Sequence, residues 1–274
     1  MKSLLMYMYN LNNINIYKSK ECIKIKDNNK EYIFYKIYNP QRIIEINDIL
    51  KNQTEYYKIV KNINNEIITI YQDKYYVLLE INTKYLIQSN NIILNNNEYS
   101  NYQINQSNWI YLWTKKNDYY ESISINNNYI KETINYYIGL AENAIEFIKY
   151  NDIYTNNLFI CNCNKNDLNN PLNVVLDCKE REVGELIKRD FFYNNISIEN
   201  IRTNLSNYDI KKIIARLLYP NYYFDIVDEF INNKVDENKL KKILSKQTKY
   251  EELIKEISKY DQSIIIPNWI KKDK

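Results

Sequence analysis

The chain has 274 residues, 45% of them hydrophobic, and is therefore long enough to bury a substantial core. It contains no His and only 2 Gly, which excludes nucleophiles activated by imidazole, His-based zinc sites and the glycine-rich loops that cradle phosphates. The 37 basic and 34 acidic residues nearly balance at a formal net charge of +3, so no basic surplus indicates a nucleic-acid partner.

The composition predicts a cytoplasmic protein with reduced thiols. Its excess of Asn, Ile, Lys and Tyr, with 29 Tyr against 7 Phe, is typical of an AT-rich coding genome. No run approaches the ~18 apolar residues of a membrane span, and the apolar run at residues 4–8 is too short for a secretory leader. We therefore expect no membrane partner. Cys161, Cys163 and Cys178 do not follow a usual zinc-ligand spacing, so we also expect no bound metal.

Residues 1–100 predict a β-rich domain with one helix. Apolar and polar residues alternate over short segments that are separated by Asn and Asp turns, which is typical of antiparallel strands. Pro40 opens a segment with a broad apolar face that ends near Leu50, and this segment predicts the helix. The expected strands lie at residues 14–17, 21–26, 32–38, 56–60, 67–71 and 75–81.

Residues 101–274 predict a mainly helical domain that begins after a polar loop at 95–107. The clearest helical pattern spans residues 130–148, and Gly139 inside it indicates a close contact with a neighbouring helix. A capping box beginning at Thr248 predicts the start of the last helix. The remaining expected elements are a helix from residue 109, a strand at 158–161, helices at 210–218, 223–231, 236–244 and 248–260, and an extended tail at 264–269.

The segment at residues 170–192 combines a buried strand, an acidic strand end and an amphipathic helix. The apolar run 172–176 ends at Asp177, and apolar residues then recur at helical spacing as far as Phe191. A carboxylate between a strand and a helix can serve chemistry. It can also cap the N-terminus of the helix, which is the more common use. The sequence leaves both roles open for Asp177.

This layout resembles the protein-kinase-like fold, in the branch that contains aminoglycoside phosphotransferases, choline kinases and bacterial spore-coat kinase-like proteins. In spore-coat relatives a strand leads to an Asp, then two or three residues, then Arg-Asp and an apolar helix. Asp177, Arg181, Glu182 and the helix after them match this pattern, and the segment 217–225 resembles a helix end in those coat proteins. The resemblance implies a two-lobed α+β fold, one kinase-like unit with a small antiparallel-β N-lobe and a larger helical C-lobe, at residues 1–100 and 101–274.

The resemblance also implies site residues, and the sequence departs from them. Such kinases carry a catalytic His-x-Asp loop with a downstream Asn, and a metal-binding Asp one strand later. Without His, the matching region at 160–167 offers only Asp167, and not in the spacing of the family. The metal-binding position falls near Asn170, whose amide cannot supply the anionic charge that usually holds Mg²⁺. Asp167 and Asp177 are therefore the catalytic candidates.

Lys36, in a strand, and Glu45, in the helix after it, could imitate the phosphate-binding Lys and its Glu partner in these kinases. A strand Lys and a helix Glu are more often surface charges. Together the departures predict a kinase-like protein that has lost phosphoryl transfer and needs no cofactor. We expect it to act by binding or assembly with a protein partner, such as the proteins of a spore coat.

Two alternatives stay open. The first is an active small-molecule phosphotransferase that uses ATP and Mg²⁺, with Asp167 or Asp177 as base or metal ligand and Lys36 on the phosphate. The second is an unrelated α+β interaction module, whose Trp-rich surface around Trp109 and Trp113 binds another protein. Two Trp residues four positions apart on a helix are more often part of a core.

Overall fold

The computed structural model describes residues 1–19, 22–81, 108–125, 127–153, 158–163, 167–194, 205–232, 237–267 and 270. The loop expected at 95–107 and the end of the tail expected at 264–269 lie outside these residues. The described chain divides into two compact units. The N-terminal unit contains the residues up to 81 together with those within Asn162–Val175, and the C-terminal unit contains residue 108 to Cys161 and Leu176 onward.

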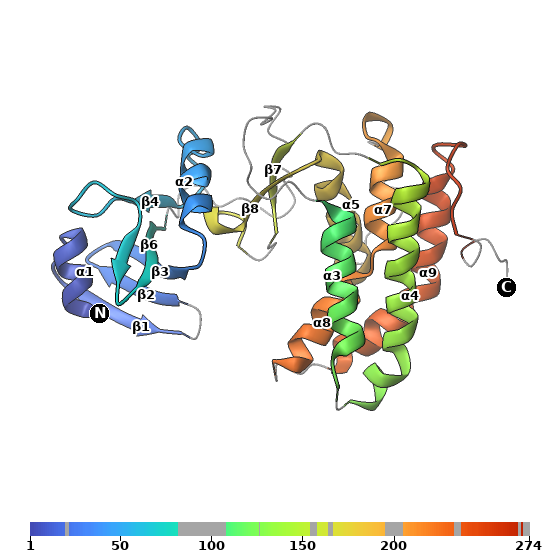
Figure 1. The fold of residues 1–274 in the computed structure, drawn as a ribbon, viewed down its shortest axis with the longest axis horizontal. Helices are drawn as coiled ribbons and strands as arrows, with labels where there is room; N and C mark the ends of the chain where they lie inside the picture. The colour runs from blue at the N-terminus through green and yellow to red at the C-terminus, as the bar shows by residue number, and fades with distance from the viewer. Residues whose placement is uncertain are drawn as a thin grey trace. The chain divides into compact units, whose positions relative to one another are not determined.

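The N-terminal unit is built on an antiparallel sheet (Figure 1). Its described strands follow the order β1-β2-β3-β6-β4, and β5 also pairs with β6. The register places Phe34 opposite Leu78 and Ile33 opposite Leu79, so the two faces of β3 and β6 are matched across the ladder. The strands are β1 (Ile14–Lys18), β2 (Cys22–Asp27), β3 (Lys30–Ile37), β4 (Lys58–Val60), β5 (Thr69–Tyr71) and β6 (Lys74–Glu80).

The turns between these strands explain why Asn and Asp recur between the predicted strand segments. Gln72 and Asp73 join β5 to β6 as a two-residue loop, and both have positive φ, at 50° and 56°. A loop with both central residues in this region matches the twist of the flanking strands. Asn28 and Asn65 likewise have φ values of 53° and 64° in their turns. The six strand segments predicted from alternation and turn residues are therefore confirmed, with ends that shift by a few residues.

Helix α1 (Lys2–Tyr9) was not expected, and the prediction of a single helix in this region is wrong. Met1 at its N-cap makes no side-chain capping bond, so the sequence carries no helix start signal there. Tertiary packing stabilises the helix instead, because Leu5 and Tyr9 are buried in one cluster with Phe34 of the sheet. The Tyr9 hydroxyl also lies 2.7 Å from Thr69 Oγ1, which ties α1 to β5.

Helix α2 (Pro40–Ile49) confirms the predicted helix. The Asn39 side chain caps it by accepting a hydrogen bond from the Arg42 N–H at 3.1 Å, and Pro40 occupies the first turn, where its missing N–H costs nothing. The Arg42 side chain also contacts the segment Leu172–Val174 of the same unit. Its Nη2 donates to the carbonyl oxygens of Leu172 at 3.1 Å and Val174 at 2.9 Å.

The C-terminal unit is mainly helical, and Figure 1 shows α3 and α4 running side by side. Helix α7 packs against α4, α5 and α9, so it lies at the centre of this unit. Strands β7 and β8 form a two-stranded sheet, and two of the sequence boundaries between the units fall within these strands. The elements are α3 (Trp109–Ser122), α4 (Asn128–Tyr150), β7 (Phe159–Asn162), β8 (Val174–Asp177), α5 (Lys179–Arg189), α7 (Ile210–Leu218), α8 (Asn221–Ile231) and α9 (Glu237–Ser258).

Two predictions for this unit are wrong. The helices expected at 236–244 and 248–260 are one helix, α9, so the capping box at Thr248 lies in a helix interior. The apolar face continues through that point, since Ile243, Tyr250 and Leu253 are all buried. Gly139 makes no close helix contact, because a Cβ built there meets no atom within 4 Å.

No helix in the described ranges is both long enough and apolar enough to cross a membrane.

Candidate functional site

Asp177 is the last residue of β8 and its side chain is completely buried. Both carboxylate oxygens accept hydrogen bonds from the protein. Oδ2 accepts from Trp109 Nε1 at 3.0 Å and from Arg181 Nη1 at 3.1 Å. Oδ1 accepts from the Cys178 N–H at 2.7 Å and makes a longer contact with Trp109 Nε1 at 3.2 Å. The carboxylate is therefore surrounded by three donors, one of them a cation.

Of the two roles left open for Asp177, the N-cap of the following helix is not the one that the structure shows. The N-cap of α5 is Cys178, which makes no side-chain capping bond. Asp177 lies one residue earlier and binds the N-cap amide rather than an amide within the first turn. Its partner Arg181 follows four residues later, so the start of α5 turns the guanidinium back toward the end of β8. Arg181 itself is largely enclosed, with its side chain 16% exposed.

The electrostatic surroundings favour the charged form of the Arg181 guanidinium. Burial alone would lower the pKa of Arg181, but the acidic groups around it, Asp177 first among them, raise that pKa above its ordinary value. The Cys161 thiol contacts the backbone at this position. Its Sγ lies 3.8 Å from the Asp177 carbonyl oxygen and 3.6 Å from the Cys178 carbonyl oxygen. Burial raises the pKa of the Cys161 and Cys178 thiols, which favours their neutral form.

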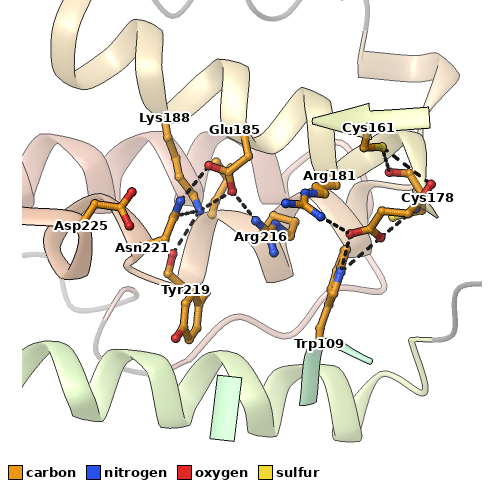
Figure 2. Close-up of polar contacts among 12 residues, drawn as sticks. Trp109, Cys161, Cys178, Arg181, Glu185, Lys188, Arg216, Tyr219, Asn221 and Asp225 are labelled. Atoms are coloured by element: carbon orange, nitrogen blue, oxygen red, sulfur yellow. Dashed lines mark hydrogen bonds and ion pairs between the residues drawn. The ribbon is translucent and has the colours of Figure 1, made fainter. Parts of the chain in front are cut away.

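A second buried ionic cluster follows on the same helix, and Figure 2 shows it beside the Arg181 group. Glu185 Oε1 accepts from Arg216 Nη2 of α7 and lies 3.3 Å from Lys188 Nζ, while Glu185 Oε2 accepts from Asn221 Nδ2 at 2.8 Å. Lys188 also donates to the Tyr219 carbonyl oxygen at 3.1 Å and to the Asn221 side chain. These contacts join α5, α7 and the start of α8.

The pKa values in this cluster follow from burial and charge pairing. Burial would raise the pKa of Glu185, but Lys188 and Arg216 and the Asn221 donor lower it below its ordinary range. Burial lowers the pKa of Lys188 to about 8, against the opposing attraction of Glu185. The charged groups of this cluster pair with one another, and buried ions require such pairing.

Aromatic rings connect the two clusters. The Trp109 ring stacks on Trp113 at 5.5 Å between centroids, and Trp113 stacks on Tyr219 at 4.3 Å. The Arg216 guanidinium lies 5.2 Å from the Trp109 ring and 5.4 Å from the Trp113 ring. Both Trp side chains are only 5% exposed. The hypothesis of a docking surface centred on Trp109 and Trp113 is therefore wrong, because both belong to the core of the C-terminal unit.

Asp167 lies in the N-terminal unit, in a separate polar group. Its Oδ2 accepts from Asn170 Nδ2 at 3.1 Å, and the same amide lies 3.2 Å from the Tyr35 hydroxyl. Burial, with the charge and hydrogen bond of Asp167, raises the pKa of Tyr57 to about 12. Asn170, near which the metal-binding position was expected, is buried and caps a short 3-10 turn, with its Oδ1 3.0 Å from the Leu172 N–H.

The other two predicted site residues do not pair. Lys36 is exposed, and its Nζ lies 4.7 Å from the centroid of the Tyr38 ring. Glu45 accepts from Gln41 Nε2 at 3.4 Å, one helical turn away. Within the described residues, no Lys36–Glu45 ion pair forms. Across those same residues, no group of three or more Cys, Asp or Glu side chains is arranged to hold a metal ion.

The sequence also carries a kinase-like spacing outside the region 160–167. In kinases, the catalytic Asp is followed five residues later by the metal-binding Asn. Asp152 and Asn157 have this spacing, and Tyr150 stands where those kinases have His. Asp152 is exposed, in the turn that follows α4, with φ at 48°; Asn157 is outside the described residues. Two aspartates, Asp167 and Asp177, lie between Asn157 and α5. Of these two, only Asp177 is the last residue of a strand, and such kinases carry the metal-binding Asp one strand after the catalytic loop.

A family model described as "Spore coat putative kinase YutH" matches residues 2–257. Among curated proteins, the sequence has no significant match.

Solved structures give the fold. An aminoglycoside phosphotransferase from Alicyclobacillus acidocaldarius superimposes with a TM-score of 0.60 at 10% identity, over 96% of this chain and 97% of that chain. The choline kinase LicA from Streptococcus pneumoniae gives a TM-score of 0.57 at 12% identity, over 94% and 97%. The spectinomycin phosphotransferase APH(9)-Ia, solved with ADP and spectinomycin, gives 0.54 at 11% identity, over 97% and 94%. The predicted kinase-like α+β fold is confirmed.

Proposed function

The chain belongs to the family of spore coat kinase-like proteins, and from this premise we propose that it is a non-catalytic member that acts by binding and assembly in the spore coat. In this proposal it is made in the cytoplasm, binds coat proteins, and transfers no phosphate. It needs neither ATP nor Mg²⁺ for this role. The proposal keeps the kinase-like fold as a rigid scaffold whose surface, rather than an active site, carries the function.

The observation that carries the proposal is the environment of Asp177. A phosphoryl-transfer site needs a carboxylate that faces the metal and the phosphates. Asp177 is completely buried, and its oxygens accept from Arg181, Trp109 and the Cys178 N–H. A carboxylate used in this way contributes to the structure and is not available to substrate.

Two further features support the proposal. Lys36 lies over the Tyr38 ring and Glu45 binds Gln41, so the ion pair that positions the phosphate-binding Lys in active kinases is not formed. The chain also has only 2 Gly, at positions 139 and 184, so no glycine-rich loop can cover a nucleotide.

A phosphotransfer assay tests the proposal. Purified protein is incubated with radiolabelled ATP and Mg²⁺, with and without an extract of coat proteins, and label transfer and phosphate release are measured. We expect no rate above that of a reaction without protein, and pull-down of coat proteins by the immobilised chain. Label transfer that depends on this protein would contradict the proposal.

One observation favours a second function, an active phosphotransferase. The exposed Asp152, with Asn157 five residues later, retains the spacing of a catalytic base and a metal ligand. If transfer is observed, Asp152→Asn should abolish it, whereas Asp118→Asn, on α3, should not change it. This pair of variants separates activity of the chain from a contaminating kinase.

A further inference from the structure

The fold family implies a divalent metal at an aspartate one strand after the catalytic loop. With the catalytic spacing at Asp152 and Asn157, that aspartate is Asp177 at the end of β8, rather than a residue near Asn170. Mg²⁺ binds with near-octahedral geometry at about 2.0–2.1 Å and keeps several water ligands. Asp177 cannot meet this requirement, because its side chain has no solvent exposure and both of its oxygens already accept hydrogen bonds. The residues present therefore do not fit Mg²⁺.

The structure holds a different cation at this carboxylate. Arg181 Nη1 lies 3.1 Å from Asp177 Oδ2 and forms an ion pair with it. The indole N–H of Trp109 also donates to Asp177 Oδ2, and the Trp109 ring is held in place by stacking on Trp113. The guanidinium and the indole thus supply the charge and the donors that a hydrated metal ion would otherwise supply.

We propose that Arg181 is the permanent internal cation of Asp177 and takes the place of the divalent metal, so that Asp177 does not bind a metal ion. This inference deepens the proposed function and rests on it. It assigns a specific role to Arg181, whose position four residues after Asp177 lets the first turn of α5 deliver the charge. It also predicts that removing the guanidinium restores a cation site.

Terbium luminescence tests the inference directly. Tb³⁺ is a probe for oxygen-ligand cation sites, and its emission on indole excitation reports binding next to a Trp ring. Trp109 Nε1 contacts Asp177 Oδ2 at 3.0 Å, so Tb³⁺ at Asp177 would be in reach of that ring. We expect Arg181→Gln to bind Tb³⁺ at least about tenfold more tightly than the wild type, and Mg²⁺ to compete for the site. Arg181→Lys, which keeps a cation, should remain like the wild type.

The variant Asp177→Asn, Arg181→Gln gives the background, because it removes both charges and should lose the gained emission. The same variant keeps the test decisive if Arg181→Gln alone fails to fold. A buried charge left alone costs more than a neutral pair, so the double variant should unfold at a higher temperature than either single variant. Asp177-dependent Tb³⁺ binding by the wild type would overturn the inference, as would a double variant less stable than both single variants.

This experiment is independent of the phosphotransfer assay. A wild-type protein that transfers phosphate but shows no Asp177-dependent Tb³⁺ emission would refute the proposed function and leave the role of Arg181 standing. A wild-type protein that binds Tb³⁺ through Asp177 but transfers no phosphate would refute the role of Arg181 alone.

Discussion

Gly184 of α5 lies directly against Arg216 of α7, so that a Cβ built at position 184 would be only 2.7 Å from Arg216 Cβ. The missing side chain at this position lets the two helices approach closely. The approach places the Arg216 guanidinium over the rings of Trp109 and Trp113 while it binds Glu185. One glycine therefore sets the geometry of the buried ionic cluster.

We expect Gly184→Ala to destabilise the C-terminal unit by about 1–2 kcal/mol, because overpacking of the α5–α7 contact outweighs the gain in helix propensity. The measurement is urea unfolding followed by Trp fluorescence, since Trp109 and Trp113 lie in the core of this unit. The matched control is Gly139→Ala in α4, where the added Cβ meets no atom within 4 Å. That control should be neutral or stabilising by up to about 1 kcal/mol. Equal effects of the two substitutions would show that the contact with Arg216 does not matter.

The second prediction concerns acid sensitivity. The pKa of Glu185 in the folded protein is below its ordinary value of 4.5, despite its burial, because Lys188 and Arg216 attract the carboxylate. Its stabilising contribution is therefore fully present above pH 4.5 and is lost as the pH falls toward the folded-state pKa. Glu185→Gln should lower the free energy of unfolding at pH 7 by about 3–5 kcal/mol, because two buried cations lose their partner.

The pH profile separates this mechanism from general destabilisation. Chemical unfolding at a series of pH values below 4.5 should show a weaker pH dependence in Glu185→Gln than in the wild type. The control is Glu146→Gln on α4, since Glu146 is exposed and pairs with Lys149 at 2.7 Å on the surface. We expect it to cost less than about 1 kcal/mol and to leave the profile unchanged.

A third prediction concerns Arg42, which donates to two carbonyl oxygens within the N-terminal unit. A Lys at this position keeps the charge but cannot reproduce the forked geometry of the guanidinium. Arg42→Lys should therefore destabilise the segment from Leu172 to Val174 by about 1.5–3 kcal/mol. Hydrogen exchange should show faster exchange of the Cys163 amide, which binds the Asn173 carbonyl oxygen at 2.8 Å. Lys26→Met, at an exposed position of β2, is the control and should leave that amide protected.

A fourth prediction concerns the four thiols. Cys163 is exposed and Cys22 is half-buried, whereas Cys161 and Cys178 are buried and burial raises the pKa of each of their thiols. We expect a disulfide reagent to modify the native protein first at Cys163 and more slowly at Cys22. The other two thiols should react only after denaturation, and Cys163→Ser should remove the fast phase. Four equivalents of rapid reaction in the native protein would contradict the packing around Asp177.

Local patterns were enough to predict the elements with strong signals. Alternation and turn residues located the strands around Phe34 and Val77, and Asn39-Pro40 marked the start of α2. Helix α1 could not be predicted, because no capping residue marks it and its stability comes from Leu5 and Tyr9 packing on the sheet. The division of α9 at Thr248 was wrong because a capping pattern also occurs inside helices whose apolar face continues.

The class of fold and the absence of His and of glycine-rich loops could be read from the sequence, since they depend on composition, periodicity and short spacings. The sequence also contained the spacing of Asp152 and Asn157, two residues five positions apart, which can be found without a structure. The surroundings of Asp177, by contrast, could be seen only once the chain was folded. Its donors come from Trp109, 68 residues earlier, and from the first turn of the next helix, and a contact across that separation depends on how α3 packs against β8. Burial is a property of the packed core, so no local pattern could distinguish a carboxylate open to a metal ion from one enclosed by an indole and a guanidinium.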